Sequence, residues 1–313
     1  MDLQVYGMRN VMEQATTHIA VDTMSGGKAA VHHGSVAYLV GGDASMNAAA
    51  AIDTDAARAI SAEAALPLAD VGTNYDTQFL RYSATHPEMR ILFCVTRGRY
   101  HIVARRSAGI ASIRDLRGKR VGTFPRTSSS YYLSRELAAN GLHESDVEIV
   151  GLAPIFEISK ALIDKRVDAI SIWEPAAQAG TDGLGDDAIE LNTPGASDHY
   201  FNLNSTAEKL ADPGKRRQIV ELTRHIIRAS QLVKEKPQIG CAWLEKATGY
   251  DRGLIDRSFH QHDYCACIAP NQLDVLVHQD QWVAQEQGRA PRTREALATL
   301  IDNTVYHEAV AGM

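Results

Sequence analysis

Strand-like and helix-like segments alternate through the centre of the chain. Three short apolar runs predict strands, at 119–124, 147–152 and 167–173. Two segments of helical character lie between them, at 131–140 and 155–165. A polar loop at 125–130 separates the first strand from the first helix. This order, with short connections, predicts a parallel sheet flanked by helices, whose strand carboxyl ends meet at one ligand-binding edge.

The N-terminal part repeats this pattern, and the last third of the chain is mostly helical. Further strands are expected at 3–6, 29–33, 69–72, 91–96 and 100–105. Further helices are expected at 44–65, 74–86, 215–233, 239–248, 273–287 and 294–307. A chain of 313 residues exceeds what a single hydrophobic core usually covers. We therefore predict an α/β protein of two lobes, each with a mainly parallel sheet flanked by helices, and a helical C-terminal third.

Composition argues against nucleic acid as a partner but does not decide the cellular location. A formal charge of −6 and a pI near 6.1 argue against a nucleic-acid-binding surface, which needs concentrated Lys and Arg. No run approaches the ~20 apolar residues of a transmembrane helix. The first residues, Met1 to Val5, lack the basic region of a secretory signal. We expect a cytoplasmic protein if Met1 is the native start, and a periplasmic or membrane-associated extracytoplasmic one if a leader was removed.

The four cysteines form no obvious disulfide framework. Cys94 lies in the apolar run 91–95 and is predicted to be a buried, inert thiol. A second segment carries residue types that bind zinc or copper, namely His260, His262, Cys265 and Cys267. Because its spacing lacks the usual pattern of metal ligands, we predict neither a metal nor a catalytic cysteine there.

The polar loop of the central unit is the first candidate ligand site. Thr127, Ser128 and Ser129 precede Ser130 between a predicted strand and a predicted helix. Amides at a helix start suit an anionic group, and hydroxyls add hydrogen-bond donors. The alternative is a plain N-cap, but one hydroxyl is enough for a cap, so the row of four favours binding. Arg126 would either add charge to the same ligand or be solvated.

The equivalent loop of the N-terminal part is a second candidate. Asn74 and Tyr75 follow a predicted strand, where they would either contact a ligand or begin the next helix. Asp76 in the first helical turn fits the helix dipole, which is its structural explanation. An acidic side chain at this position weakens the case for a strongly anionic ligand.

Two more groups stand at predicted strand ends. Trp173 offers a flat apolar wall and Glu174 a hydrogen-bond acceptor; the alternatives are a core position and a helix cap. Arg9, Asn10 and Glu13 follow the first strand and are placed at the ligand edge by topology alone.

Several of these segments together resemble a known family. They are Ser107–Ile110 with Asp115–Val121, the strand and polar loop 122–130, the strand 167–170 ending in Trp173-Glu174-Pro175, and Ala69–Gly72. In that order they resemble the sulfonate-, taurine-, nitrate- and pyrimidine-precursor-binding group of ABC-transporter substrate-binding proteins. The first 68 residues match that group poorly.

The resemblance implies a periplasmic-binding-protein type II fold, with lobe I at 1–99 and 203–313 and lobe II at 100–202. It also implies a hinged protein that closes on a small polar or anionic ligand and delivers it to an ABC permease. The alternative is a cytoplasmic enzyme on the same scaffold, similar to desulfinases or thiamine-pyrimidine synthases. No catalytic residue, cofactor or metal is predicted, because no catalytic arrangement of side chains stands out in the sequence.

Overall fold

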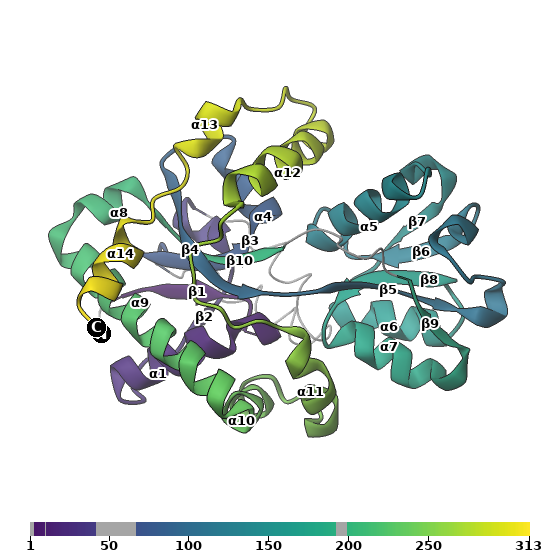
Figure 1. The fold of residues 1–313 in the computed structure, drawn as a ribbon, viewed down its shortest axis with the longest axis horizontal. Coiled ribbons are helices and arrows are strands. Elements are labelled where there is room, and N and C mark those ends of the chain that lie inside the picture. The colour runs from purple at the N-terminus through teal and green to yellow at the C-terminus, as the bar shows by residue number, and fades with distance from the viewer. Residues whose placement is uncertain (1–2, 10, 42–66, 192–198) are drawn as a thin grey trace. The chain divides into compact units, whose positions relative to one another are not determined.

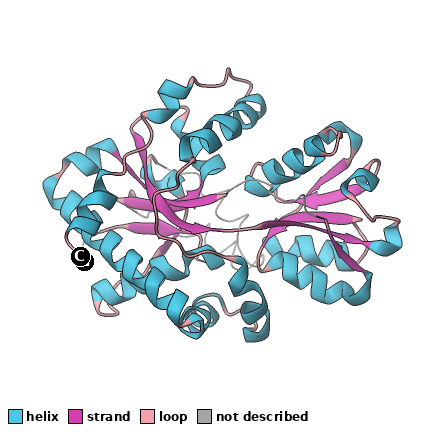
Figure 2. Ribbon diagram, in the orientation of Figure 1, coloured by secondary structure: helices cyan, strands magenta, loops and turns pink. Residues whose placement is uncertain are grey.

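The computed structural model describes residues 3–9, 11–41, 67–191 and 199–313, and these divide into two compact units (Figure 1). Unit 1 contains 3–9, 11–41, 67–98 and 199–313, and unit 2 contains 99–191. Each unit has its own sheet with helices on both faces, as Figure 2 shows. The chain passes from unit 1 to unit 2 between Gly98 and Arg99.

The sheet of unit 1 has five strands in the order β2-β1-β3-β10-β4. Their bounds are Val5–Gly7 (β1), His32–His33 (β2), Val71–Tyr75 (β3), Met89–Arg97 (β4) and Tyr200–Thr206 (β10). Strand β1 pairs in parallel with β2 and β3, whereas β10 is antiparallel to β3 and β4. The parallel strands β1 and β3 therefore end side by side.

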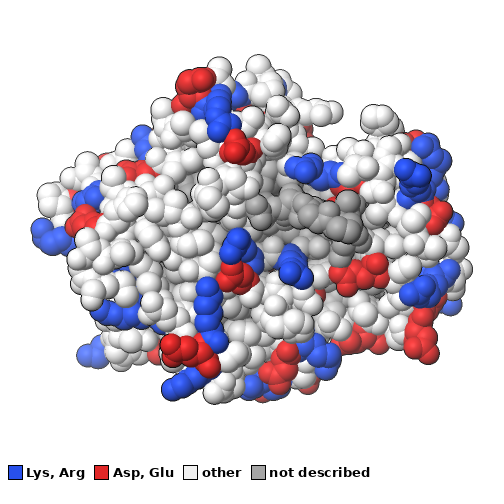
Figure 3. Space-filling view, in the orientation of Figure 1, with Lys and Arg blue, Asp and Glu red and all other residues white. Residues whose placement is uncertain are grey.

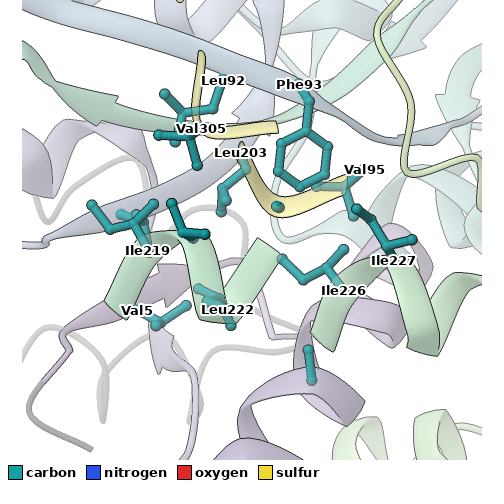
Figure 4. Close-up of a cluster of buried hydrophobic side chains, with 14 of the residues drawn as sticks. Val5, Leu92, Phe93, Val95, Leu203, Ile219, Leu222, Ile226, Ile227 and Val305 are labelled. Atoms are coloured by element: carbon teal, nitrogen blue, oxygen red, sulfur yellow. The ribbon is translucent and has the colours of Figure 1, made fainter. Parts of the chain in front are cut away.

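Helices cover both faces of this sheet (Figure 1). Their bounds are Ala15–Ser25 (α1), Asp76–Ser83 (α4), Ala207–Ala211 (α8), Pro213–Glu235 (α9), Pro237–Thr248 (α10), Arg252–Ser258 (α11), Gln272–Gln287 (α12), Arg294–Ala298 (α13) and Thr304–Ala311 (α14). Side chains of a strand alternate between faces, so Val5 packs with α9 and Tyr6 with the cluster that includes α4 and α12. Figure 4 shows the first of these cores, where Leu203 meets Ile219 and Ile226.

The sheet of unit 2 has the order β7-β6-β8-β5-β9. Its strands are Tyr100–Arg105 (β5), Arg120–Thr123 (β6), Glu148–Gly151 (β7), Ala169–Trp173 (β8) and Ala188–Glu190 (β9). Its helices are Ser128–Ala139 (α5), Ile155–Ile163 (α6) and Ala176–Leu184 (α7). Strand β6 is parallel to β7 and β8, whereas β5 is antiparallel to β8 and β9. The predicted central strand–helix–strand–helix–strand unit is confirmed.

Among the differences from the sequence-based prediction, three concern the candidate loops and the C-terminal third. The expected loop 125–130 ends early, because α5 already begins at Ser128 with Thr127 as its N-cap. The expected loop after β3 is strand as far as Tyr75, because β10 pairs with it to that point. The helix expected at 294–307 is two helices, since the backbone between α13 and α14 bonds to the edge of β4 instead. The helix expected at 44–65 lies outside the described residues.

The edge of β4 is also covered by an extended segment from the C-terminal third. Arg97 pairs with Asp263, and Cys94 pairs with Cys267, both in antiparallel bridges. Among the described helices, none combines the length and the apolar content of a membrane-spanning segment. On the face shown in Figure 3, basic and acidic side chains are interspersed and form no large basic patch.

Candidate functional site

Buried polar side chains gather at the carboxyl ends of parallel strands in each unit. In unit 1 they follow β1 and β3, and we call Glu13, Gln14, Tyr75 and Asp76 the carboxyl cluster. In unit 2 they lie at the end of β6 and at the start of β5, which pairs with the end of β8, and the hydroxyl cluster is defined by its members Tyr100, Thr123, Thr127, Ser128 and Ser129. All of these side chains are at most 7% exposed. This is the edge at which open α/β sheets bind ligands.

Glu13 is fully buried just after β1, in a short 3-10 turn at Met12–Gln14. Its Oε1 accepts a hydrogen bond from the Tyr75 hydroxyl at 2.7 Å and lies 3.6 Å from His262 Nε2. Its Oε2 has no hydrogen-bond partner among the described residues. Buried acceptors are almost always paired, so this oxygen is a candidate ligand contact.

Because Gly98 has no side chain, the Tyr75 hydroxyl and the Glu13 carboxylate can pack directly against its backbone. A Cβ at this position would lie 2.1 Å from the Tyr75 hydroxyl oxygen and 3.1 Å from Glu13 Oε1. Real Cβ atoms essentially never show the first distance, and the second is tighter than most of their contacts, so any larger residue must displace the Tyr75 hydroxyl and press on Glu13.

Gly98→Ala is therefore expected to disturb the carboxyl cluster and to lower the free energy of unfolding by about 1–3 kcal/mol, the usual cost of overpacking a buried site. Urea unfolding measures the loss. Gly118→Ala is a useful comparison of a different kind, because Gly118 has no atom near its Cβ position and its strain comes only from a φ of 71°. If Gly98→Ala has wild-type stability and leaves the tyrosine fluorescence unchanged, the tight packing described here is wrong.

Asp76 begins α4, with its side chain 1% exposed. Its Oδ1 accepts hydrogen bonds from Asn202 Nδ2 and Gln272 Nε2, each at 2.7 Å. Its Oδ2 has no partner in the described parts of the chain. Burial raises the pKa of Asp76 to about 7, although the two amide donors act in the opposite direction. The backbone amide of Tyr200 also lowers the pKa of this carboxyl, and Oδ2 is a candidate acceptor for a donor of the ligand.

A further group of buried polar atoms lies at the start of α1. Gln14 Nε2, Thr16 Oγ1, Thr17 Oγ1 and His18 Nε2 lack hydrogen-bond partners among the residues described. Folded proteins leave only a few such atoms per hundred residues, and here they fall within five positions. Burial lowers the pKa of His18 to about 3, with a contribution from the charge of Arg9, so its ring is neutral near pH 7.

The residues at the start of α1 were not among the predicted site residues. The signal available was a run of polar residues, 13–18, directly after a strand. Of the residues that were predicted there, Arg9 is exposed and Asn10 lies outside the described residues. Asn74 is buried in β3, where its Oδ1 accepts a hydrogen bond from the amide of Tyr75 at 2.8 Å.

In unit 2, the hydroxyls of Thr127 and Ser129 are used inside the protein. Thr127 Oγ1 accepts from the Ser129 amide at 3.3 Å and donates to the Phe124 carbonyl at 2.8 Å. Ser129 Oγ lies 3.0 Å from both Thr123 Oγ1 and Thr127 Oγ1. Ser128 Oγ accepts a hydrogen bond from the Tyr100 hydroxyl. The N-cap explanation thus accounts for Thr127, and the Ser129 hydroxyl does not point to a ligand.

The backbone of this loop is the better candidate for anion binding. The Ser129 and Tyr131 amides bond to Thr127, whereas a helix offers no acceptor to the amides of Ser128 and Ser130 in its first turn. These amides carry the partial positive charge of the 12-residue helix α5. Arg126 precedes them on the exposed side, with a left-handed φ of 58°.

Trp173 and Glu174 end β8 and make internal contacts. The Trp173 ring packs edge-on against Tyr100 and Phe124, with centroids 6.1 and 6.0 Å apart. Glu174 Oε2 accepts from the Gln178 amide at 3.1 Å, and Oε1 lies 3.3 Å from His101 Nε2. Both side chains therefore have structural roles in unit 2, and whether they also contact a ligand stays a prediction.

The predicted site residues thus form two groups, one in each unit. The structure brings Glu13, Tyr75 and Asp76 to one sheet edge, and Thr127 to Ser129 with Trp173 to another. The described residues contain no group of three or more His, Cys, Asp or Glu side chains placed to hold a metal ion.

Residues 51–238 match the NMT1/THI5-like family, and this match covers more than half of the chain. The protein belongs to the NMT1/THI5-like family. No curated protein sequence matches the chain.

Solved structures show the same fold at low sequence identity. The alkanesulfonate-binding protein SsuA from Xanthomonas axonopodis pv. citri, bound to MOPS, is 14% identical, with 96% of this chain and 97% of that chain covered and a TM-score of 0.67. The periplasmic nitrate-binding protein NrtA from Synechocystis PCC 6803 is 13% identical, with 100% of this chain and 89% of that chain covered and a TM-score of 0.69. The desulfurization enzyme DSZB is 12% identical, with 98% of this chain and 99% of that chain covered and a TM-score of 0.60. The predicted periplasmic-binding-protein type II fold is confirmed, and identities this low show the fold alone.

Proposed function

We propose that this NMT1/THI5-like protein binds one small polar organic molecule, on which its two units close. The observation that carries the proposal is the carboxyl cluster of unit 1, where Glu13 Oε2 and Asp76 Oδ2 are buried acceptors without partners among the described residues. Leaving such atoms unpaired costs roughly 1–3 kcal/mol each, so a resident ligand is the simplest reason to keep them. The domain limits predicted above, 1–99 with 203–313 and 100–202, remain part of this proposal.

The two units offer groups of opposite character to a ligand. The two carboxyl groups of unit 1 accept hydrogen bonds from N–H or O–H donors and repel an anion. In unit 2, the amides at the start of α5 and the positive charge of Arg126 favour a hydrogen-bond acceptor or an anionic group. The ligand we propose carries a donor, such as an amine or a ring N–H, at one end and an acceptor at the other. A bare nitrate or a simple alkanesulfonate lacks the donor.

The finer role we propose is substrate-binding component of an ABC-type uptake system, outside the cytoplasm, with a permease as partner. The support is the fold shared with SsuA and NrtA, which are named as binding proteins for alkanesulfonate and nitrate. Binding of this kind needs two clusters of ligand contacts and no catalytic residue, and the carboxyl and hydroxyl clusters are the candidates for them.

An enzyme on the same scaffold is the second candidate. The observation in its favour is the contact of the buried Glu13 carboxyl with the Tyr75 hydroxyl and the His262 ring, three groups that can exchange protons. DSZB, named as a desulfurization enzyme, shares the fold. The fold therefore does not decide between binding and catalysis.

Native mass spectrometry of protein purified without refolding tests the binding proposal. We expect a co-purified small molecule of fixed mass that is lost on denaturation. Thermal shift then compares a zwitterionic aminosulfonate with nitrate and with an alkanesulfonate that lacks an amine, and only the first should raise Tm. Conversion of the bound molecule on incubation would favour the enzyme instead. Absence of both a bound molecule and any shift would contradict the proposal.

A further inference from the structure

Three of the four cysteines lie together on unit 1, and none of them belongs to the carboxyl cluster. Cys94 is buried in β4, and Cys265 and Cys267 belong to the segment that pairs with the edge of that strand. The sulfur of Cys265 lies 3.5 Å from that of Cys94. The two backbone hydrogen bonds between Cys94 and Cys267, at 2.9 and 2.8 Å, fix the segment in place. The proposed binding function uses none of these thiols.

The thiols of Cys265 and Cys267 lie close enough to interact through a hydrogen bond. In a fully extended chain, residues two apart are about 6.6 Å apart at the Cα atoms, and a bend brings them closer. Ala266 between them has a left-handed φ of 40°, which bends the chain locally. Disulfides need Cα atoms about 4.4–6.8 Å apart, so this pair is within reach of one.

The three thiols differ in burial, in hydrogen bonding and in the direction of their pKa shifts. Cys94 is fully buried, and its thiol donates to the Thr96 carbonyl at 3.4 Å. Cys265 and Cys267 are both partly exposed. Hydrogen bonds from the Cys265 and Cys94 thiols lower the pKa of Cys267, and the positive charge of Arg97 acts in the same direction. Burial, together with hydrogen bonding to the other two cysteines, raises the pKa of Cys94.

We propose that this trio is a thiol oxidation site, at which a hydroperoxide converts Cys265 and Cys267 into an intramolecular disulfide. In the first step the Cys267 thiolate attacks one peroxide oxygen, the O–O bond breaks, and the leaving hydroxide takes a proton to become water. Cys267 is then a sulfenic acid. In the second step the Cys265 sulfur attacks the Cys267 sulfur, the S–O bond breaks, and a second water leaves. Two thiols and one hydrogen peroxide give one disulfide and two waters.

Cys94 has a supporting role in this scheme. Its sulfur accepts a hydrogen bond from the Cys265 thiol and its own thiol donates to the Thr96 carbonyl; because Cys94 is fully buried, we expect it to stay reduced. Cys241 is also buried, in α10, and is not part of the trio. It therefore provides a matched control for a buried cysteine elsewhere in the same unit.

The test is a titration of the reduced full chain with hydrogen peroxide, followed by intact mass and peptide mapping. We expect the mass to fall by two hydrogen atoms, with a Cys265–Cys267 link in the wild type, in Cys94→Ser and in Cys241→Ser. In Cys265→Ser, dimedone should trap a sulfenic acid on Cys267. In Cys267→Ser the reaction with peroxide should slow by about tenfold or more, because the thiolate is the nucleophile.

Circular dichroism of each variant checks that it is folded, and the Cys265→Ser adduct gives a readout that does not need a disulfide. A link that includes Cys94 or Cys241, a disulfide between two chains, or an unchanged rate in Cys267→Ser would overturn the proposal.

Discussion

Asp76→Asn is expected to raise the free energy of unfolding at pH 7.5 by on the order of 3 kcal/mol. Burial raises the pKa of Asp76 from 3.8 to about 7, so keeping this carboxyl charged inside the protein costs stability. Asparagine keeps the oxygen that accepts from Asn202 and Gln272. It replaces Oδ2, which has no partner in the described part of the chain, by an uncharged amide.

The sign and the pH range of this effect follow from the pKa. Below about pH 3.8 Asp76 is protonated in both the folded and the unfolded chain, so the two variants should have similar stability. Between 3.8 and 7 the folded chain binds the proton more tightly, and the wild type loses stability relative to Asp76→Asn as the pH rises. Above about 7 the difference is constant.

Urea unfolding at pH 4.5 and at pH 7.5 measures this difference. His18 changes stability with pH in the opposite direction. Folding lowers its pKa from 6.5 to about 3, so its contribution to the free energy of unfolding rises as the pH rises through that range. Comparing the two variants at each pH cancels that contribution. Asp274→Asn is the matched control, since Asp274 lies exposed in the first turn of α12 and should change stability by less than about 0.5 kcal/mol. A gain that does not grow with pH would show that Asp76 is not held charged at a cost.

A gain in stability from Asp76→Asn should come with a loss of binding. The Asp76 carboxylate lowers the free energy of unfolding of the ligand-free protein, and its Oδ2 is the proposed acceptor for a donor of the ligand. Residues that a protein keeps against its own stability are commonly functional, so stability and affinity should move in opposite directions in this variant.

Much of the fold could be predicted from the sequence because local patterns agree with the tertiary structure there. The strand ending at Trp173 is a short apolar run fully buried by helices on both faces, and such runs are distinctive. The break at 299–303 could not be predicted, since Ile301 leaves the helix to pair with Ile91, far away in sequence. Pairing with a distant strand overrides local helical preference.

The candidate site was less predictable than the fold, for a physical reason. The position of a strand end follows from topology, but the direction of a side chain follows from packing. Asp76 fitted either a ligand contact or a partner of the helix dipole, and its side chain is buried with amide partners. The Ser129 hydroxyl was predicted to contact a ligand and bonds to Thr123 and Thr127. The sequence placed these residues near strand ends, as the structure does, but it could not predict the direction of their side chains.

Ser128→Pro tests which atoms of the hydroxyl cluster bind the ligand. Ser128 is the first residue of α5, where proline is well tolerated because the helix has no acceptor for that amide. Thr127 before it is already extended, with φ −113° and ψ 178°, as a residue before proline prefers. The substitution therefore removes one N–H while preserving the helix.

We expect Ser128→Pro to weaken binding of the co-purified molecule by about 10- to 100-fold relative to Ser128→Ala, the usual worth of a hydrogen bond to a charged group. Ser128→Ala is the matched control, because both variants lose the hydroxyl that accepts from Tyr100 and only alanine keeps the amide. Isothermal titration of ligand-free protein measures both affinities, and urea unfolding checks that the two variants are equally stable. Equal affinities in the two variants would mean that the amide of Ser128 does not contact the ligand, and the anionic end of the ligand would have to be bound elsewhere in unit 2.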